Sequence, residues 1–177
     1  MKVYISLSKV ELDLDQAYEI FRESYTKAVG TSWDRQKFMR RAHNWEFYGD
    51  QTGFIAVRHQ RSGLVKLTGV AGSIKGIFKG FKELQQKDWP IWGMMDLRLA
   101  KHLQKQGYVR PPAFLIKLLA KSIPKGVFGG VDIDIQSDGG IKFHYHDVGD
   151  ATKYFVATPA YFKHILKDLL VHELDCS

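Results

Sequence analysis

In the N-terminal half, the spacing of hydrophobic residues switches several times between that of a helix and that of a strand, which predicts both helices and strands. Apolar residues three and four apart predict an amphipathic helix over residues 13–29, and Gly30 supplies its stop. A second helix is expected over residues 33–42, with Thr31 or Ser32 as its N-cap. Alternating patterns predict four strands, the last three forming an antiparallel meander, at residues 2–7, 46–48, 53–58 and 64–71.

In the C-terminal half, the spacing of hydrophobic residues also switches between that of a helix and that of a strand. An apolar run at residues 89–95 is typical of a buried strand, and alternation predicts further strands at residues 131–136, 141–146 and 154–158. Helical spacing, with stop signals at the ends, predicts helices at residues 74–86, 96–106, 113–121 and 159–171. Residues 173–177 are expected to form a frayed tail.

The strands at residues 131–136 and 141–146 form the clearest hairpin. A three-residue loop at residues 138–140 places the isoleucines and aromatic side chains of both strands on one face, with glycine at the left-handed position. On the other face, this register pairs each aspartate with a histidine: Asp134 with His144, and Asp132 with His146.

Carboxylate and imidazole groups that face each other on a strand surface have more than one interpretation. A neighbouring carboxylate raises the pKa of a histidine and orients its ring, as a general base requires, so His144 with Asp134 is the candidate catalytic pair. The alternative is a solvated strand face with ordinary cross-strand charge pairs. The alternating histidines can also chelate a metal, but the sequence fixes no third ligand, and we expect no metal site.

Composition indicates a single soluble domain over residues 1–172. The chain has 177 residues, of which 45% are hydrophobic and 25% charged, which is enough for a sizeable core. Cys176 is the single cysteine, so no intramolecular disulfide can form and a reducing, cytoplasmic location is expected. No stretch has the length and hydropathy of a transmembrane segment, and the first residues lack the apolar core of a signal peptide.

The formal net charge of +7 favours an anionic partner. Basic residues gather in the predicted helix over residues 33–42 and near the start of the helix over residues 74–86, where they could form a track for nucleic acid. The alternative is a solvated helix face, because no base-reading or stacking motif accompanies the charges. Triad hydrolases, P-loop enzymes and common zinc enzymes have no support, because none of their sequence patterns is present.

Two segments carry a resemblance to a known family. Residues 70–80 contain a strand, a turn and a helix start in which Gly80 matches the last glycine of an Arg/Gln-x-x-Gly-x-Gly/Ala motif. Residues 92–108 contain a strand and a helix that ends in Lys-Gln-Gly-Tyr. Together with the order of the elements before them, these segments make residues 1–112 similar to the GNAT superfamily of N-acyltransferases.

The resemblance implies an α/β fold, with a mixed, mostly antiparallel sheet flanked by helices and followed here by a C-terminal β-hairpin and helix. It also implies that N–H groups at a helix start bind the pyrophosphate of acetyl-coenzyme A or another acyl-coenzyme A, which gives its acyl group to an amine. A strand N–H near Val70 or Ala71 is expected to hold the developing oxyanion. The residues that the resemblance assigns to the cofactor are Val70, Ala71, Gly72, Ser73, Lys75, Gly76, Ile77 and Lys79.

Three positions depart from the family pattern. Lys75 stands where arginine or glutamine is usual, Phe78 replaces the middle glycine, and Leu103 replaces the tyrosine that often acts as general acid. Two alternatives therefore stay open. One is a non-catalytic GNAT-like scaffold with a protein partner, such as a virion or assembly protein of a bacteriophage, located in the host cytoplasm or the virion. The other is a GNAT-like enzyme that acts on DNA, which the positive charge motivates.

Overall fold

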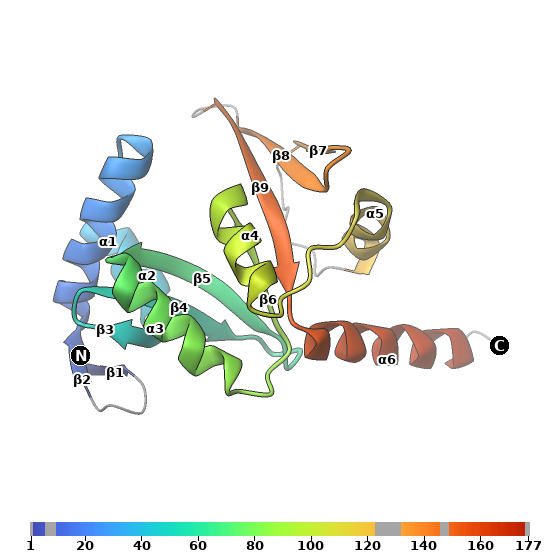
Figure 1. Ribbon diagram of the computed structural model, residues 1–177, viewed down its shortest axis with the longest axis horizontal. Coiled ribbons are helices and arrows are strands. Elements are labelled where there is room, and N and C mark those ends of the chain that lie inside the picture. Colours follow the sequence, from blue (N-terminus) through green and yellow to red (C-terminus); the bar gives the residue numbers. More distant parts are fainter. Residues whose placement is uncertain (1, 6–9, 123–131, 146–148, 176–177) are drawn as a thin grey trace. The chain divides into compact units, whose positions relative to one another are not determined.

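The computed structural model describes residues 2–5, 10–122, 132–145 and 149–175 of the protein (Figure 1). The chain divides into two compact units, unit 1 at Met1–Asp88 and unit 2 at Trp89–Ser177. Both units contain helices and strands, which confirms the expected α/β class. None of the helices in the described part of the chain combines the length and the hydropathy needed to cross a bilayer.

The strands of unit 1 follow one another in the order β2-β1-β3-β4-β5. Strands β1 and β3 are parallel and the other neighbours are antiparallel, which gives the mixed, mostly antiparallel sheet expected from the sequence. The predicted meander is confirmed as β3-β4-β5, whereas β2 was not predicted, because four alternating residues beside a helix make a very short pattern. The strands are β1 Lys2–Ile5, β2 Val10–Asp13, β3 Glu46–Asp50, β4 Gly53–His59 and β5 Val65–Gly72.

The helices of unit 1 are α1 Leu14–Val29, α2 Arg35–Ala42 and α3 Ile74–Gln85. Helix α1 ends at Gly30, as predicted, because Gly30 adopts the left-handed conformation with φ 78° and its N–H donates to the Thr26 carbonyl.

The N-cap of α2 is Asp34, and the expectation of Thr31 or Ser32 was wrong. The Asp34 carboxylate accepts the N–H of Lys37 at 2.7 Å. An aspartate in this position satisfies an orphan donor and also places negative charge at the positive end of the helix. Asp34 is therefore the cap, whereas the hydroxyl groups of Thr31 and Ser32 lie farther from the first turn.

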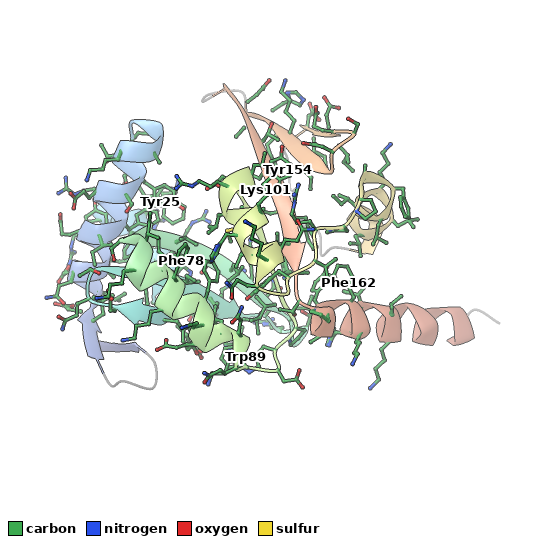
Figure 2. All side chains as sticks on the ribbon, in the orientation of Figure 1. Tyr25, Phe78, Trp89, Lys101, Tyr154 and Phe162 are labelled. Carbon is green, nitrogen blue, oxygen red and sulfur yellow. The ribbon has the colours of Figure 1, made fainter. Side chains whose placement is uncertain are left out.

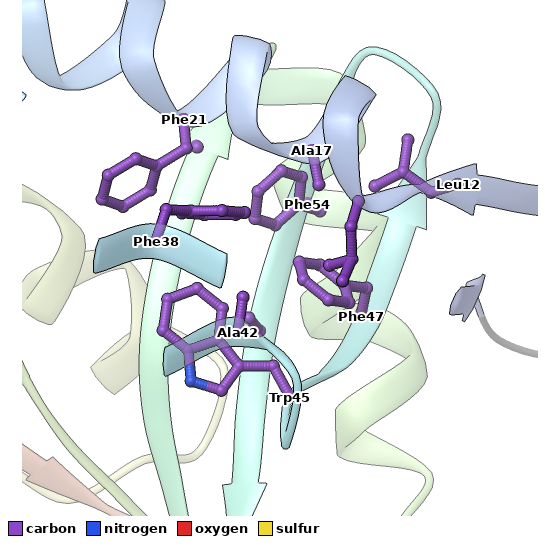
Figure 3. Close-up of a cluster of buried hydrophobic side chains, with 11 residues drawn as sticks. Leu12, Ala17, Phe21, Phe38, Ala42, Trp45, Phe47 and Phe54 are labelled. Carbon is purple, nitrogen blue, oxygen red and sulfur yellow. The ribbon is translucent and has the colours of Figure 1, made fainter. Parts of the chain in front are cut away.

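A chain of aromatic rings forms the core of unit 1 (Figure 3). The ring centroids of Phe21 and Phe38 lie 5.1 Å apart, those of Phe38 and Trp45 5.7 Å, and those of Phe47 and Phe54 5.0 Å. Tilted and edge-on contacts at these separations are favourable beyond the area that they bury. Because the rings come from α1, α2, β3, β4 and the segment before β3, this core ties both helices to the sheet.

The strands of unit 2 follow one another in the order β6-β9-β8-β7, and each described pair is antiparallel. The expected C-terminal hairpin and helix are confirmed as β7-β8 and α6. Strand β9 begins earlier than predicted, α6 continues past its predicted end at residue 171, and Pro124, the predicted end of α5, lies outside the described residues. The elements are β6 Ile91–Met95, α4 Leu97–Lys105, α5 Ala113–Ser122, β7 Asp132–Ile135, β8 Gly140–Tyr145, β9 Gly149–Ala157 and α6 Pro159–Asp175.

The register of the β7-β8 hairpin differs from the predicted one by two residues. Asp132 lies opposite His144 and Asp134 opposite Lys142, with the loop at residues 137–139. The length of the loop, the shared apolar face and a left-handed glycine were predicted correctly, because a shift of two residues leaves every side chain on its face. Gly139 holds the left-handed position at φ 85°, so Gly140 joins β8 instead of the loop; His146 lies outside the described residues.

Candidate functional site

The residues assigned to the cofactor meet at the junction between β5 and α3 in unit 1. Strand β5 ends at Gly72 in the left-handed region, with φ 91°, and Ser73 caps α3 by accepting the Gly76 N–H on its Oγ at 3.1 Å. The N–H of Ser73 itself donates to the Thr52 carbonyl at 2.9 Å. The turn therefore has a fixed conformation at the place where the sequence predicted a cofactor site.

Two backbone donors remain at this helix start. The N–H groups of Ile74 and Lys75 have no hydrogen-bond acceptor within the described parts of the chain, and the N-terminus of a helix carries partial positive charge. The side chains of Lys75 and Lys79 are exposed on the same helix. These groups can together hold an anionic group.

Asp50 supplies a carboxylate on the sheet side of the same helix start. Its Oδ1 accepts the hydroxyl of Thr52 at 2.6 Å, the N–H of Thr52 at 2.7 Å and the N–H of Gly53 at 3.1 Å. These hydrogen bonds, led by that from the Thr52 hydroxyl, hold the pKa of Asp50 below its ordinary value, and the charge of Lys79 adds to them. The Asp50 carboxylate is thus ionised at neutral pH and orders the β3-β4 turn.

Two glycines of α3 serve the packing of the helix on the sheet. A Cβ atom on Gly76 would lie 2.4 Å from the Gly53 carbonyl oxygen, and one on Gly80 would lie 2.4 Å from the Tyr48 carbonyl oxygen. No side chain fits at such distances. Gly80, the one outright match to the family motif, is therefore required by the contact between α3 and β3.

Phe78 lies on the solvent side of α3 (Figure 2). Its side chain is 41% exposed, and that of Ile74, one turn earlier, is 58% exposed. Both apolar side chains share the outer side of the helix with Lys75 and Lys79. The outer side of this helix start is therefore mixed in character, with cations interleaved between apolar groups.

Strand β5 contains an irregularity just before Val70. Gly69 pairs with Ala56, whereas Leu67 pairs with Val57, so Thr68 is an extra residue on β5. The Thr68 hydroxyl donates to the Ala56 carbonyl at 3.1 Å. A bulge of this kind interrupts the ladder and changes the direction of the strand, and such bulges are frequent next to active sites.

The candidate catalytic pair lies in unit 2, where His144 is bound by two carboxylates. Its Nε2 lies 2.9 Å from Oδ2 of Asp134 on β7, and its Nδ1 lies 3.0 Å from Oδ1 of Asp150 on β9. The two aspartates, Asp134 first, raise the pKa of His144 above its ordinary value. Asp134 thus reaches His144 diagonally, although the two residues are not directly opposite in the ladder.

Asp150 was missed by the sequence analysis. The predicted strand began at residue 154, whereas β9 begins at Gly149 and places Asp150 directly opposite His144. Lys142 also contacts Asp150, with Nζ 3.0 Å from Oδ2, and Lys142 and His144 together lower the pKa of this carboxylate. Only imidazolium can donate to both carboxylates, so His144 must first lose the proton from one of its nitrogens before it can accept another proton.

Several basic residues of helix α2 form contacts within unit 1. Arg35 forms an ion pair with Asp15 of α1. The Nζ atom of Lys37 lies 5.2 Å, and the Cζ atom of Arg41 lies 5.1 Å, from the ring centroid of Trp33. These cations have structural contacts, and nucleic-acid binding by the helix stays a prediction.

Two further findings concern catalysis and metal binding. Leu103, at the position where the family often has a tyrosine, is fully buried in α4 and offers no acid. Within the described residues, no group of three histidine, cysteine, aspartate or glutamate side chains is placed to hold a metal ion.

Unit 2 also contains a pocket that the sequence analysis did not find. It has a volume of about 210 Å³. The described residues that line it come from α4, the segment between α4 and α5, the β7-β8 loop and β9: Gln104, Arg110, Pro111, Pro112, Asp138, Gly139, Tyr154 and Phe155.

Comparisons of the chain with protein-family models, with curated proteins and with solved structures find no significant match.

Proposed function

We propose that the protein is an N-acyltransferase that takes an acyl group from a coenzyme A thioester and transfers it to an amine. The observation that carries this proposal is the β5-α3 junction. A capped helix start presents the N–H groups of Ile74 and Lys75, which have no acceptor among the residues that the structure describes. The exposed ammonium groups of Lys75 and Lys79 lie on the same helix. Coenzyme A carries several phosphate charges, and this combination of donors and cations suits them.

The proposed reaction is a direct transfer. The amine nitrogen attacks the thioester carbon, a C–N bond forms, the C–S bond breaks, and the thiolate leaves with a proton from solvent or an acid. The backbone near Val70 and Ala71, just after the Thr68 bulge, is the proposed donor to the carbonyl oxygen as negative charge develops on it. The proton released by the amine goes to solvent or to a base. The candidate base from the sequence, His144 with Asp134, belongs to unit 2, and only its neutral form could accept a proton.

Titration calorimetry with coenzyme A, acetyl-coenzyme A and pantetheine tests the binding step. Pantetheine has the thiol arm but no phosphates, so we expect it to bind much more weakly than coenzyme A. The double variant K75Q/K79Q should bind coenzyme A about tenfold more weakly, because two exposed charges are lost near the phosphates. The matched control is K82Q, which removes an exposed lysine farther along α3.

Two results would contradict the proposal. One is no binding of coenzyme A or acetyl-coenzyme A at millimolar concentration. The other is an equal loss of affinity in K75Q/K79Q and K82Q, which would mean that net charge and not the helix start attracts the ligand. If binding is found, a rate of acyl transfer that is unchanged in His144→Gln would remove His144 as the proton acceptor.

A non-catalytic scaffold is the second candidate, and the surface of α3 favours it. Ile74 and Phe78 are exposed apolar side chains at the helix start, and the buried Leu103 supplies no acid. Such a chain would use the fold to bind a protein partner, as a virion or assembly component of a bacteriophage does. Stoichiometric incorporation of the chain into a particle would support this candidate, whereas turnover of acyl-coenzyme A would count against it.

A further inference from the structure

The pocket in unit 2 has a positively charged wall at Arg110. The backbone of Arg110 is fixed on both sides, by a pair of hydrogen bonds before it and by Pro111 after it. The Val109 N–H donates to the Ala157 carbonyl at 2.7 Å, and the Ala157 N–H donates to the Val109 carbonyl at 3.0 Å. Pro111 is buried and restricts the backbone further. The side chain of Arg110 therefore extends from a backbone whose position is fixed.

The hydrogen-bonding capacity of Arg110 is largely unused. Its Nε atom is buried and has no acceptor among the residues that the structure describes. Its Nη1 atom lies 3.5 Å from Oε1 of Gln104, at the outer limit for a hydrogen bond. A guanidinium has five N–H donors in a planar fork that matches a carboxylate, and a buried donor without an acceptor is unfavourable.

The same pocket is also lined by the carboxylate of Asp138. Its Oδ1 accepts the Gly140 N–H at 2.9 Å and its Oδ2 accepts the Tyr154 hydroxyl at 2.9 Å. These hydrogen bonds, led by that from Gly140, hold its pKa below the ordinary value, and the charge of Arg110 contributes to the shift. Asp138 is therefore ionised at neutral pH, and each oxygen keeps a lone pair for a further donor.

Tyr154 contacts both of these charged side chains. Its ring lies under the guanidinium, with the Arg110 Cζ 5.1 Å from the ring centroid, while its hydroxyl binds Asp138. Arg110 and Asp138 line one pocket, and no ion pair between these two described side chains is found. A cation and an anion placed in this way are complementary to a ligand that has one charge of each sign.

The remaining lining of the pocket is closely packed at Gly139 and partly apolar. A Cβ atom on Gly139, which has φ 85°, would lie 3.1 Å from the Pro111 carbonyl oxygen, so the β7-β8 loop packs closely against the start of α5. Pro111, Pro112 and Phe155 offer apolar surface. The pocket, at about 210 Å³, is smaller than the roughly 300–1,000 Å³ of sites for drug-sized ligands, so its ligand is small.

We infer that this pocket binds a small α-amino acid with an apolar side chain. Its carboxylate pairs with the guanidinium of Arg110, its ammonium group donates to Asp138, and its side chain lies against Pro111, Pro112 and Phe155. The inference does not rest on the coenzyme A proposal, because every residue of the pocket lies in unit 2 and the test measures binding alone.

Titration calorimetry of the full chain with L-valine, isovalerate, isobutylamine and inorganic phosphate tests the inference. Isovalerate lacks the ammonium group of valine, and isobutylamine lacks its carboxylate. We expect L-valine to bind and both fragments to bind about 10- to 100-fold more weakly, since each loses a charge-assisted contact. Failure of L-valine to bind at tens of millimolar, or equal binding of isovalerate or phosphate, would overturn the inference.

Three variants locate the binding. R110Q should remove valine binding, and R98Q, which deletes an exposed arginine of α4, should leave it unchanged. R110K keeps the charge and the alkyl stem but not the planar fork, so a folded R110K should bind valine about tenfold more weakly than the wild type. Valine affinity that is the same in R110K and the wild type, or reduced as much by R98Q as by R110Q, would place the ligand elsewhere.

Discussion

The imidazole of His144 joins strand β8 to strand β9 through Asp150, with Nδ1 of the histidine 3.0 Å from Oδ1 of the carboxylate. Its other nitrogen joins β8 to β7 through Asp134. One side chain thus connects three neighbouring strands of unit 2. The protonated form makes both contacts at once, because only imidazolium has an N–H on each nitrogen.

The first prediction concerns pH. Because folding raises the pKa of His144, its contribution to stability is complete below the unfolded value of about 6.5 and is lost as the pH rises through the folded value. The difference in melting temperature between the wild type and H144Q should therefore be larger at about pH 5.5 than at about pH 8.5.

A titration of His144 by NMR checks the cause of this effect. Asp150→Asn should lower the pKa of His144. Asp132→Asn should change it much less, although Asp132 lies directly opposite His144 in the ladder. Equal effects of the two substitutions would show that the general negative charge of the hairpin, and not the contact with Asp150, raises the pKa.

The second prediction concerns the packing of α3. An alanine in place of glycine inside a helix normally stabilises it by about 1 kcal/mol. Gly80→Ala should instead destabilise unit 1 by about 1–3 kcal/mol, because the new Cβ meets the Tyr48 carbonyl oxygen at 2.4 Å. Urea unfolding of the variant measures the change, and an increase in stability would contradict the close contact.

The third prediction distinguishes the two candidate caps of α2. Asp34→Ala should lower the free energy of unfolding by about 0.5–2 kcal/mol, because the Lys37 N–H loses its acceptor. Thr31→Ala is the control and should have little effect, since Thr31 is exposed. A larger loss in Thr31→Ala, again by urea unfolding, would restore the hydroxyl cap that the sequence suggested.

The fourth prediction concerns Tyr154 and Asp138. Tyr154→Phe keeps the ring beneath Arg110 and removes the hydroxyl that donates to Asp138. The pKa of Asp138 should rise but stay below its ordinary value, because the stronger contribution, from the Gly140 N–H, remains. A carboxylate titration by NMR measures the shift, and an unchanged pKa would mean that the hydroxyl donates elsewhere.

The sequence was most informative where local signals determine the structure. Gly30 ends α1 through its own left-handed conformation, and the meander at β3-β4-β5 follows from alternation and short turns. The cap of α2 was misassigned because threonine, serine and aspartate, all capping residues, lie close together before it. Choosing Asp34 requires the position of the first turn, which the pattern gives only to within a few residues.

Contacts between segments that are distant in the sequence could not be predicted from the pattern of hydrophobic and polar residues. The hairpin register was wrong by two residues because burial depends on the face of a side chain and not on its place along the strand. Asp150 was missed for the related reason that β9 begins in a polar stretch. Arg110 gave no signal, because the Val109–Ala157 pairing that fixes its backbone joins segments far apart in the chain.

The aromatic core of unit 1 also has a spectroscopic consequence. Of the four tryptophans, Trp33 and Trp45 belong to unit 1, with ring centroids 6.4 Å apart, and Trp89 and Trp92 belong to unit 2. With phenylalanine at both unit 2 positions, tryptophan emission would come from unit 1 alone, and with the reverse pair of substitutions it would come from unit 2 alone. The intrinsic fluorescence of two such chains would report, unit by unit, whether the halves of this protein melt together or in sequence.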